Sequence, residues 1–411
     1  MKKLLIIGNV WPEPTSSAAG TRMMQLIDFF LKEDYQVHFA TTASRSAFVP
    51  DLEGQGIITE NIKLNSPSFD TYIEALEPEI VLFDRFMMEE QFSWRVDKFC
   101  PNALKILDTE DLHFIRKARN QAYKEKKDPK EIYFTSDIAK REIASIYRCD
   151  LSLIISEVEM ELLIREFNIP ANLLFYLPFM LENISTDDIK KLADYDERKD
   201  FVTIGNFLHE PNRNAVLFLK EKIWPGIRKL LPEANLHIYG AYPSEKILKL
   251  NDPKNGFFVH GRAEDAEVEM KKARICLAPL QFGAGLKGKL IQAMQCGTPS
   301  VTTEIGAEGI CGVLPWNGFI ENDPEKFVNA AVQLYRDESR WKAYQANGFE
   351  IINSRFSAEI FRRKFQNKLQ IQDKLIEQRK QNFIGAMLRH HLHRSTYFMA
   401  RFIEEKNKTA G

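Results

Sequence analysis

The chain has 411 residues, which is too long for one ordinary hydrophobic core and favours two domains of roughly 180 residues each. Hydrophobic residues make up 44% of the chain and charged residues 27%, a composition typical of a globular protein. The formal net charge of −1 argues against a general nucleic-acid binder, because such proteins carry a basic excess.

The chain begins with a short apolar run, Leu4 to Ile7, which is followed at once by Trp11-Pro-Glu-Pro14. This run is shorter than the core of a signal peptide and predicts a buried first strand instead. No apolar stretch approaches the roughly 18 residues that a membrane span needs. The five cysteines are scattered and form no C-x-x-C pair, which fits a reducing compartment. We therefore expect a cytoplasmic protein.

Short apolar runs alternate with helical patterns along most of the chain. In the first half the expected strands are 4–8, 36–41, 80–84, 103–107 and 151–156; in the second they are 201–205, 235–240, 257–261, 274–280 and 300–303. Most are continuously apolar, as parallel strands covered by helices on both faces are. The alternation predicts an α/β protein with two Rossmann-like, doubly wound domains.

The domain limits follow from where this alternation stops. Apolar periodicity fades between 183 and 199, so we expect an N-terminal domain over 1–182, a linker over 183–199 and a C-terminal domain over 200–355. Within the first domain, Ser156-Glu-Val-Glu159 has the pattern of a capping box, in which the serine and the glutamate close the start of a helix reciprocally.

The tail over 356–411 is helical and basic in pattern, with Phe361, Phe365, Leu369 and Ile376 on one face. Three of the eight histidines lie in Arg389-His-His-Leu-His393. No carboxylate or cysteine is spaced to complete a metal site with them, so a solvated helix face is favoured and no metal is expected. A patch that contacts a membrane surface or a polyanion is the alternative.

The most informative stretch is the loop over 283–289, Gly-Ala-Gly-Leu-Lys-Gly-Lys, which joins an expected strand to a helix. A helix N-terminus presents unpaired N–H groups and a partial positive charge, and glycines let a ligand approach that backbone closely. Lys287 and Lys289 add cations where a helix disfavours them, which suggests that a bound anion compensates. Gln292 shares the polar face with Lys289. The loop therefore predicts a phosphate site.

The same loop is formally G-x-G-x-x-G, and Glu304 follows about 20 residues later, as in an NAD-binding fingerprint. Two features oppose this alternative. The motif lies late in the second half instead of at a first β–α turn, and two lysines suit a departing diphosphate better than a bridging pyrophosphate.

The loop and its continuation resemble the retaining, family-four branch of GT-B glycosyltransferases. The similarity covers Gly283-Ala-Gly-Leu-Lys-Gly-Lys289 and then Gly297-Thr-Pro-Ser-Val-Thr-Thr-Glu-Ile-Gly-Ala-Glu-Gly309. Weaker similarities lie in Trp11-Pro-Glu-Pro, Gly20-Thr-Arg22, Asp108-Thr-Glu-Asp-Leu-His113 and Gly205-Asn-Phe-Leu-His-Glu-Pro-Asn212. The resemblance implies a GT-B fold, in which two Rossmann-like domains face a central cleft and C-terminal helices cross back onto the first domain.

The resemblance also implies roles for residues. A nucleotide-sugar donor, a UDP- or GDP-sugar, would be held mainly by the C-terminal domain without a metal or other cofactor, and a glycan or lipid-linked acceptor by the N-terminal domain. The backbone from Gly285 through Leu286 to Lys287, together with Lys289, would hold the diphosphate. The family's two glutamates map onto Ala284 and Gln292; glutamine can still bind ribose hydroxyls, but without charge assistance.

Other candidates complete the expected site. Transfer of the sugar builds negative charge on the leaving diphosphate. Catalysis therefore depends mainly on cations and dipoles that point at this diphosphate. Arg213 and Arg22 are candidate further cations, and His113 is a candidate for orienting the acceptor or contacting the sugar. Glu308 is a candidate ribose ligand. The residues expected to contact the donor are Gly20, Arg22, Gly205, Gly283, Gly285, Leu286, Lys287, Lys289, Gln292 and Glu308; those expected to act in catalysis are His113, Lys289 and Arg213.

Three functions remain open from the sequence. The first is a glycosyltransferase that acts on a glycan or lipid-linked acceptor, with possible peripheral membrane contact at the cytoplasmic face. The second is a catalytically weakened GT-B scaffold or partner subunit, which Ala284 and Gln292 motivate. The third is an NAD-dependent enzyme.

Overall fold

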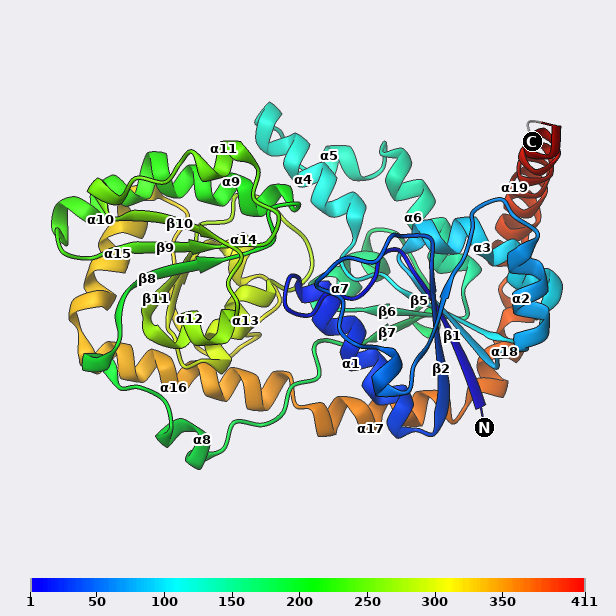
Figure 1. Cartoon of the computed structure of the whole chain (residues 1–411), viewed down its shortest axis with the longest axis horizontal. Helices are drawn as coiled ribbons and strands as arrows, with labels where there is room; N and C mark the ends of the chain where they lie inside the picture. Colours follow the sequence, from blue (N-terminus) through cyan, green and yellow to red (C-terminus); the bar gives the residue numbers. More distant parts are fainter. Residues whose placement is uncertain (1, 410–411) are drawn as a thin grey trace.

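A computed structural model describes residues 2–409, which form two α/β domains side by side (Figure 1). The first has a seven-stranded sheet in the order β3-β2-β1-β4-β5-β6-β7, and the second a six-stranded sheet in the order β10-β9-β8-β11-β12-β13. Every strand pair is parallel. In both sheets the strand order reverses beside the first strand, β1 or β8, which is the topology of a doubly wound Rossmann-like domain. The predicted fold class is confirmed.

The N-terminal sheet and its helices occupy the first part of the chain. Its strands are β1 Lys2–Gly8, β2 Tyr35–Thr41, β3 Ile58–Asn61, β4 Ile80–Asp84, β5 Leu104–Asp108, β6 Leu151–Ile154 and β7 Leu174–Tyr176. Its helices are α1 Ala18–Lys32, α2 Ser68–Leu76, α3 Phe86–Phe99, α4 His113–Glu125, α5 Lys130–Tyr133, α6 Asp137–Arg148 and α7 Glu157–Arg165.

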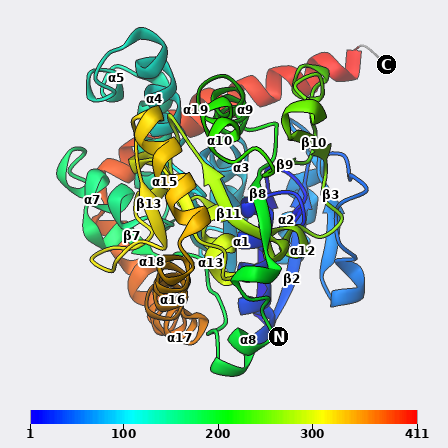
Figure 2. The ribbon, with the colours of Figure 1, turned by 90° about the vertical axis from the view of Figure 1, so that its left-hand side faces the viewer.

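The C-terminal sheet follows after α8 Thr186–Lys190. Its strands are β8 Lys199–Ile204, β9 Leu236–Tyr239, β10 Phe257–Gly261, β11 Ala273–Ala278, β12 Ser300–Thr302 and β13 Gly318–Ile320. Its helices are α9 Glu210–Phe218, α10 Trp224–Leu230, α11 Glu245–Leu248, α12 Ala266–Lys272, α13 Gly288–Gln295, α14 Glu304–Ala307, α15 Pro324–Arg336 and α16 Glu338–Arg355. Figure 2 shows this domain in front of the N-terminal one.

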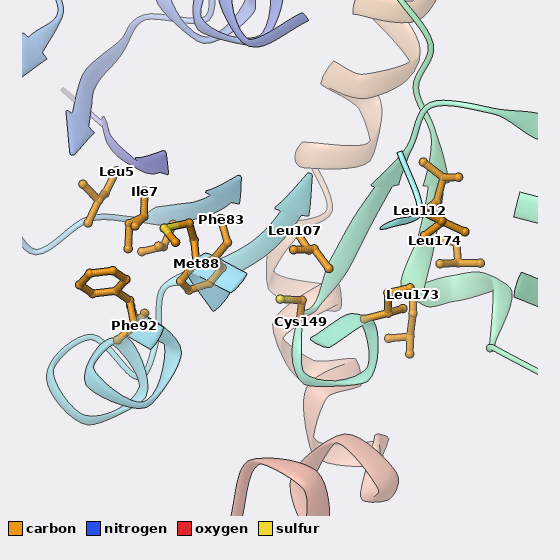
Figure 3. Close-up of a cluster of buried hydrophobic side chains, with 14 of the residues drawn as sticks. Leu5, Ile7, Phe83, Met88, Phe92, Leu107, Leu112, Cys149, Leu173 and Leu174 are labelled. Carbon is orange, nitrogen blue, oxygen red and sulfur yellow. The ribbon is translucent and has the colours of Figure 1, made fainter. Parts of the chain in front are cut away.

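Successive residues of the buried strands point to opposite faces of each sheet, and both faces are covered. Leu5 and Ile7 pack with Phe83 and Phe92 on the side of α3, part of the cluster shown in Figure 3. The alternate residues of the same strands, such as Leu4 and Ile6, belong to a second cluster with α1 and α17. This two-sided burial explains the continuous apolar runs in the sequence.

The structure adds three strands to the ten expected, namely β3, β7 and β13. Each lies at the edge of a sheet and has only three or four residues. In β3 only Thr59 is even partly buried, so its sequence carries little apolar signal. Edge strands are covered least, and for that reason periodicity did not predict these three.

After α16 the chain crosses back to the N-terminal domain through α17 Ala358–Leu369, α18 Gln372–Gln381 and α19 Phe383–Thr409 (Figure 1). The crossing begins with a backbone exchange, in which Leu181 N–H donates to Phe356 O at 2.8 Å and Ala358 N–H to Leu181 O at 2.7 Å. Phe365 then packs on Phe29, with 4.7 Å between ring centroids. The predicted return of the C-terminal helices is confirmed.

Candidate active site

A cavity of about 1040 Å³ separates the two domains at the carboxyl ends of their strands. The N-terminal domain lines it with the loop before α1 and with residues that follow β4 and β5. The C-terminal domain lines it with the turn after β8 and with the loop that leads into α13. Ligands of doubly wound domains bind at this edge of the sheet, so the cavity is the candidate site.

The predicted loop forms the C-terminal wall of the cavity, and α13 begins directly after it, at Gly288. Gly285 has φ of +61°, in the left-handed region, and a Cβ there would lie 2.9 Å from the Cβ of Asp111. Glycine is therefore required both for the backbone conformation and for the close approach of the two domains. Gly283, Ala284, Leu286 and Gln292 also line the cavity.

Lys289 lies in the first turn of α13 and lines the cavity. Its Nζ donates to Asn212 Oδ1 at 2.8 Å, and no carboxylate pairs with it among residues 2–409. Burial lowers the pKa of Lys289 to about 8. Gly205 leaves room for this contact, since a Cβ at that position would lie 2.9 Å from Nζ. A partly buried ammonium without a counter-ion, at the positive end of a helix, is a site for an anion.

Lys287 does not share this arrangement, although the sequence placed both lysines on the diphosphate. Its Nζ donates to Gly285 O at 2.7 Å and lies 3.8 Å from the Glu308 carboxylate. Burial lowers its pKa. The Lys287 side chain is therefore bound within its own loop. The backbone of Lys287, at the N-cap of α13, is left to contact a ligand.

Glu159 ties the loop to the N-terminal domain. One carboxylate oxygen, Oε1, accepts from Gly285 N–H at 2.7 Å and from Leu112 N–H at 3.2 Å. The Ser156 side chain caps nothing, so the predicted capping box is wrong. Burial raises the pKa of Glu159 to about 7. One of the loop N–H groups assigned to the diphosphate is thus already bound by a carboxylate.

The start of α4 faces the loop across the cavity. His113 and Asp111 both line the cavity, with 3.5 Å between His113 Nε2 and Asp111 Oδ1. Burial lowers the pKa of His113 to about 3, so the imidazole is neutral at physiological pH. Arg116 Nε donates to Asp111 at 2.6 Å and, against the opposing effect of burial, holds the pKa of that carboxyl below its usual value. A neutral imidazole can orient a hydroxyl but carries no charge to a phosphate.

Four predicted residues do not line the cavity. Arg22 is 1% exposed and donates to Asp108 and to the Leu177 carbonyl, which uses its guanidinium inside the N-terminal domain. Gly20 packs on the backbone of Glu13, which a Cβ would meet at 2.4 Å. Arg213 follows the cavity-lining Asn212 but lies outside the cavity wall. The sequence indicates which residues lie near the site, but it does not show which partners their side chains bind.

Glu308 is the fourth. Its two carboxylate oxygens accept from the Arg119 guanidinium at 2.7 Å each, which joins the loop after α14 to α4 of the other domain. The ion pair is largely buried, with side-chain exposures of 13% for Arg119 and 19% for Glu308. Its carboxylate therefore joins the two domains and does not line the cavity in this structure.

Replacing Glu308 with Gln is expected to lower the free energy of unfolding by about 2–3 kcal/mol, because a buried guanidinium loses its charged partner. Urea unfolding measures this change, with the exposed Glu304→Gln as the control. Donor affinity should change little. An unchanged unfolding free energy together with a loss of UDP affinity would instead place Glu308 on the nucleotide.

Two cavity residues that the sequence did not single out for binding are Arg85 and Glu110. Arg85 directly follows β4, and Glu110 lies two residues after β5, both at the edge of the cavity. The position after a parallel strand is the signal that could have identified them. Among the described residues, no group of three or more His, Cys, Asp or Glu is arranged to hold a metal ion. No helix within residues 2–409 is long and apolar enough to cross a membrane.

Comparison with known proteins extends these observations. Residues 198–337 match the family model described as glycosyl transferases group 1. No curated protein matches the sequence. Among solved structures, TarM of S. aureus, in a complex with fondaparinux, alpha-GlcNAc-glycerol and UDP, superimposes with a TM-score of 0.68 at 13% identity, covering 89% of this chain and 99% of that one.

Two further structures are similar to the whole chain. Anabaena Alr3699/HepE, in complex with UDP and glucose, gives a TM-score of 0.67 at 14% identity over 90% of this chain and all of that one (100%). Sucrose-phosphate synthase of Thermosynechococcus elongatus gives 0.64 at 14% identity over 90% and 98%. The solved structures confirm the predicted GT-B fold, and residues 198–337 match a glycosyltransferase family model.

Proposed function

We propose that the chain transfers a sugar from a UDP- or GDP-sugar to a glycan or lipid-linked acceptor, with retention at the anomeric carbon. The observation that carries the proposal is Lys289, a partly buried cation at the N-terminus of a helix that borders the cavity, with no carboxylate partner among residues 2–409. A diphosphate is the anion that supplies the missing charge. The complexes of HepE and TarM with UDP support this ligand.

In this proposal the two walls of the cavity have different roles in the reaction. As the bond between the sugar and the diphosphate breaks, Lys289 and the N–H groups at the start of α13 stabilise the negative charge that builds on the leaving group. The neutral His113 orients a hydroxyl on the opposite wall. Gln292 binds the ribose hydroxyls through hydrogen bonds that no charge assists. Retention, the absence of a metal and the type of acceptor rest on the resemblance of the loop.

Calorimetric titration of the purified protein with UDP, GDP and NAD, followed by a transfer and hydrolysis assay with UDP- and GDP-sugars, tests the proposal. We expect UDP or GDP to bind and a sugar to be released or transferred. Nucleotide binding without turnover would favour the weakened scaffold that Ala284 and Gln292 motivate. Binding of NAD in place of UDP and GDP would overturn the proposal.

We also propose that the protein contacts the cytoplasmic face of a membrane through α19. Phe398 and Phe402 on its outer face are each 66% exposed, and further apolar and basic side chains share this face. The exposed residues of the face are Phe383, Ile384, Met387, His390, His391, Arg394, Phe398, Met399 and Phe402. Aromatic and basic residues together on one face are typical of helices that lie on anionic lipid.

The double substitution Phe398→Ser and Phe402→Ser is expected to weaken binding to vesicles that contain phosphatidylglycerol by about tenfold or more, because two exposed rings are lost. Co-sedimentation measures the bound fraction. Phe134→Ser, at another exposed phenylalanine (56%), is the matched control. Equal binding by all three proteins, or none by the wild type, would contradict the membrane contact.

A further inference from the structure

We propose that Arg85 and Glu110 form an acceptor subsite for two neighbouring hydroxyl groups of an uncharged sugar ring. The inference rests on the proposed function, because it supplies the acceptor to the same cavity. Both residues line that cavity from the N-terminal domain, Arg85 directly after β4 and Glu110 two residues after β5. β4 and β5 are neighbours in the sheet, and their last residues, Asp84 and Asp108, are paired in register.

The Arg85 guanidinium has no hydrogen-bond partner among residues 2–409. Its nearest acidic neighbour is Asp84, with 3.6 Å between Nε and Oδ1, too long for a hydrogen bond. Oδ2 of Asp84 accepts from Asn9 N–H at 2.9 Å, so this carboxylate is also held by the loop after β1. The Arg85 side chain is only 14% exposed, and its fixed fork of five N–H donors is left for a ligand in the cavity.

Glu110, like Arg85, has no hydrogen-bond partner for its side chain among residues 2–409. It is 8% exposed and lines the cavity, and within the described part of the chain its carboxyl group makes no hydrogen bond or ion pair. Because Glu110 borders the cavity, its hydrogen bonds are left to water or to a ligand that displaces that water.

The backbone conformation of both residues agrees with this reading. Arg85 has φ of +71° and Glu110 has φ of +60°, a region that residues other than glycine seldom adopt. Such conformations cost of order 1–3 kcal/mol each and persist where the surrounding structure enforces them, often at ligand sites. Here they place two unsatisfied side chains at one end of two adjacent strands.

The surrounding charges select an uncharged ligand. Asp108 is already paired with Arg22, and Asp111 with Arg116. Arg85, unlike Lys289, already has a counter-ion in Asp84, whose Oδ1 lies 3.6 Å from Nε, so an incoming anion would gain little from it. Burial and the neighbouring Asp108 raise the pKa of Glu110 well above its ordinary value. A protonated carboxyl both donates and accepts, as a sugar hydroxyl does, so donors from Arg85 and a mixed group at Glu110 fit adjacent hydroxyls.

Saturation-transfer difference NMR tests the subsite with UDP present. The probes are methyl α-D-mannopyranoside, methyl α-D-glucopyranoside and, as the anionic comparison, methyl β-D-glucuronide. The variants are Arg85→Met, Glu110→Leu and Glu110→Gln, with Arg141→Met as the control, because Arg141 lies outside the cavity and pairs with Glu90. UDP affinity, measured on every variant, reports whether the protein is folded and the donor half is intact.

We expect a neutral glycoside to bind the wild type and Arg141→Met, and to bind Arg85→Met and Glu110→Leu about tenfold more weakly, as the loss of a hydrogen-bonded pair predicts. Glu110→Gln should retain binding, since an amide also donates and accepts. No signal from any glycoside on the wild type, equal signals from all variants, or preference for the glucuronide would overturn the subsite. Failure of both UDP and GDP to bind the wild type would instead overturn the proposed function.

Discussion

Replacement of Lys289 with methionine is expected to weaken UDP binding and sugar transfer by roughly 30- to 150-fold. This range corresponds to about 2–3 kcal/mol for a charge-assisted contact with a diphosphate. The protein itself should be at least as stable as the wild type, because the substitution removes a partly buried charge whose one hydrogen-bond partner among residues 2–409 is Asn212. Calorimetry gives the UDP affinity and thermal unfolding gives the stability.

Substitutions at two other lysines serve as comparisons for Lys289→Met. Lys249→Met, at the exposed residue that follows α11, should leave UDP affinity unchanged. Lys287→Met should affect it less than Lys289→Met does, since Lys287 Nζ already donates to Gly285 O. Equal losses at Lys287 and Lys289 would contradict the geometry, although the sequence alone favoured them.

The lowered pKa of Lys289 gives the same claim a pH dependence. The free protein loses this proton as the pH rises through about 8, and a diphosphate binds the protonated form. UDP affinity should therefore fall above pH 8, by up to about tenfold per pH unit, and should do so in the wild type and not in Lys289→Met. A flat profile in the wild type would mean that another group holds the phosphates.

Replacement of Glu159 with alanine is expected to cost about 2–4 kcal/mol of unfolding free energy, because it leaves the buried N–H groups of Leu112 and Gly285 without an acceptor. UDP affinity should fall as well, since Gly285 loses the contact that fixes its loop. Urea unfolding and calorimetry measure the two effects. Glu159→Gln keeps the accepting oxygen and is the matched control.

The pH dependence separates these variants further. A carboxyl whose pKa is raised by folding, here to about 7, binds more protons in the folded state. Its contribution to stability is present below the unfolded value of about 4.5 and is lost as the pH rises through 7. The wild type should therefore lose roughly 3 kcal/mol relative to Glu159→Gln between pH 5 and 8. Parallel pH profiles for the two proteins would contradict the buried position of the charge.

The sequence predicted the parts of this protein that depend on local pattern. Most of the ten strands that the sequence predicted are continuously apolar because both faces of each sheet are covered, and the residue types of the glycine loop alone indicate a helix N-terminus. The edge strands β3, β7 and β13 were not predicted because they have only three or four residues and are only partly covered by neighbours.

The parts that failed depend on partners far away in the chain. Ser156 and Glu159 have the spacing of a capping box, yet Glu159 binds Gly285, which lies in the other domain. Arg22 was expected at the donor and pairs with Asp108, and Glu308 was expected at the ribose and pairs with Arg119. Residue type and local spacing specify what such side chains can bind, whereas the packing of the two domains decides what they do bind.

The most direct test of the donor site is a crystal structure of the protein with UDP. We predict that the diphosphate lies at the start of α13, with oxygens within hydrogen-bond distance of Lys289 Nζ and of the backbone N–H groups that follow Gly285. The ribose should lie beside Gln292, and Glu308 should remain on Arg119. A diphosphate bound elsewhere in the cavity, with Lys289 still held by Asn212 alone, would contradict the account.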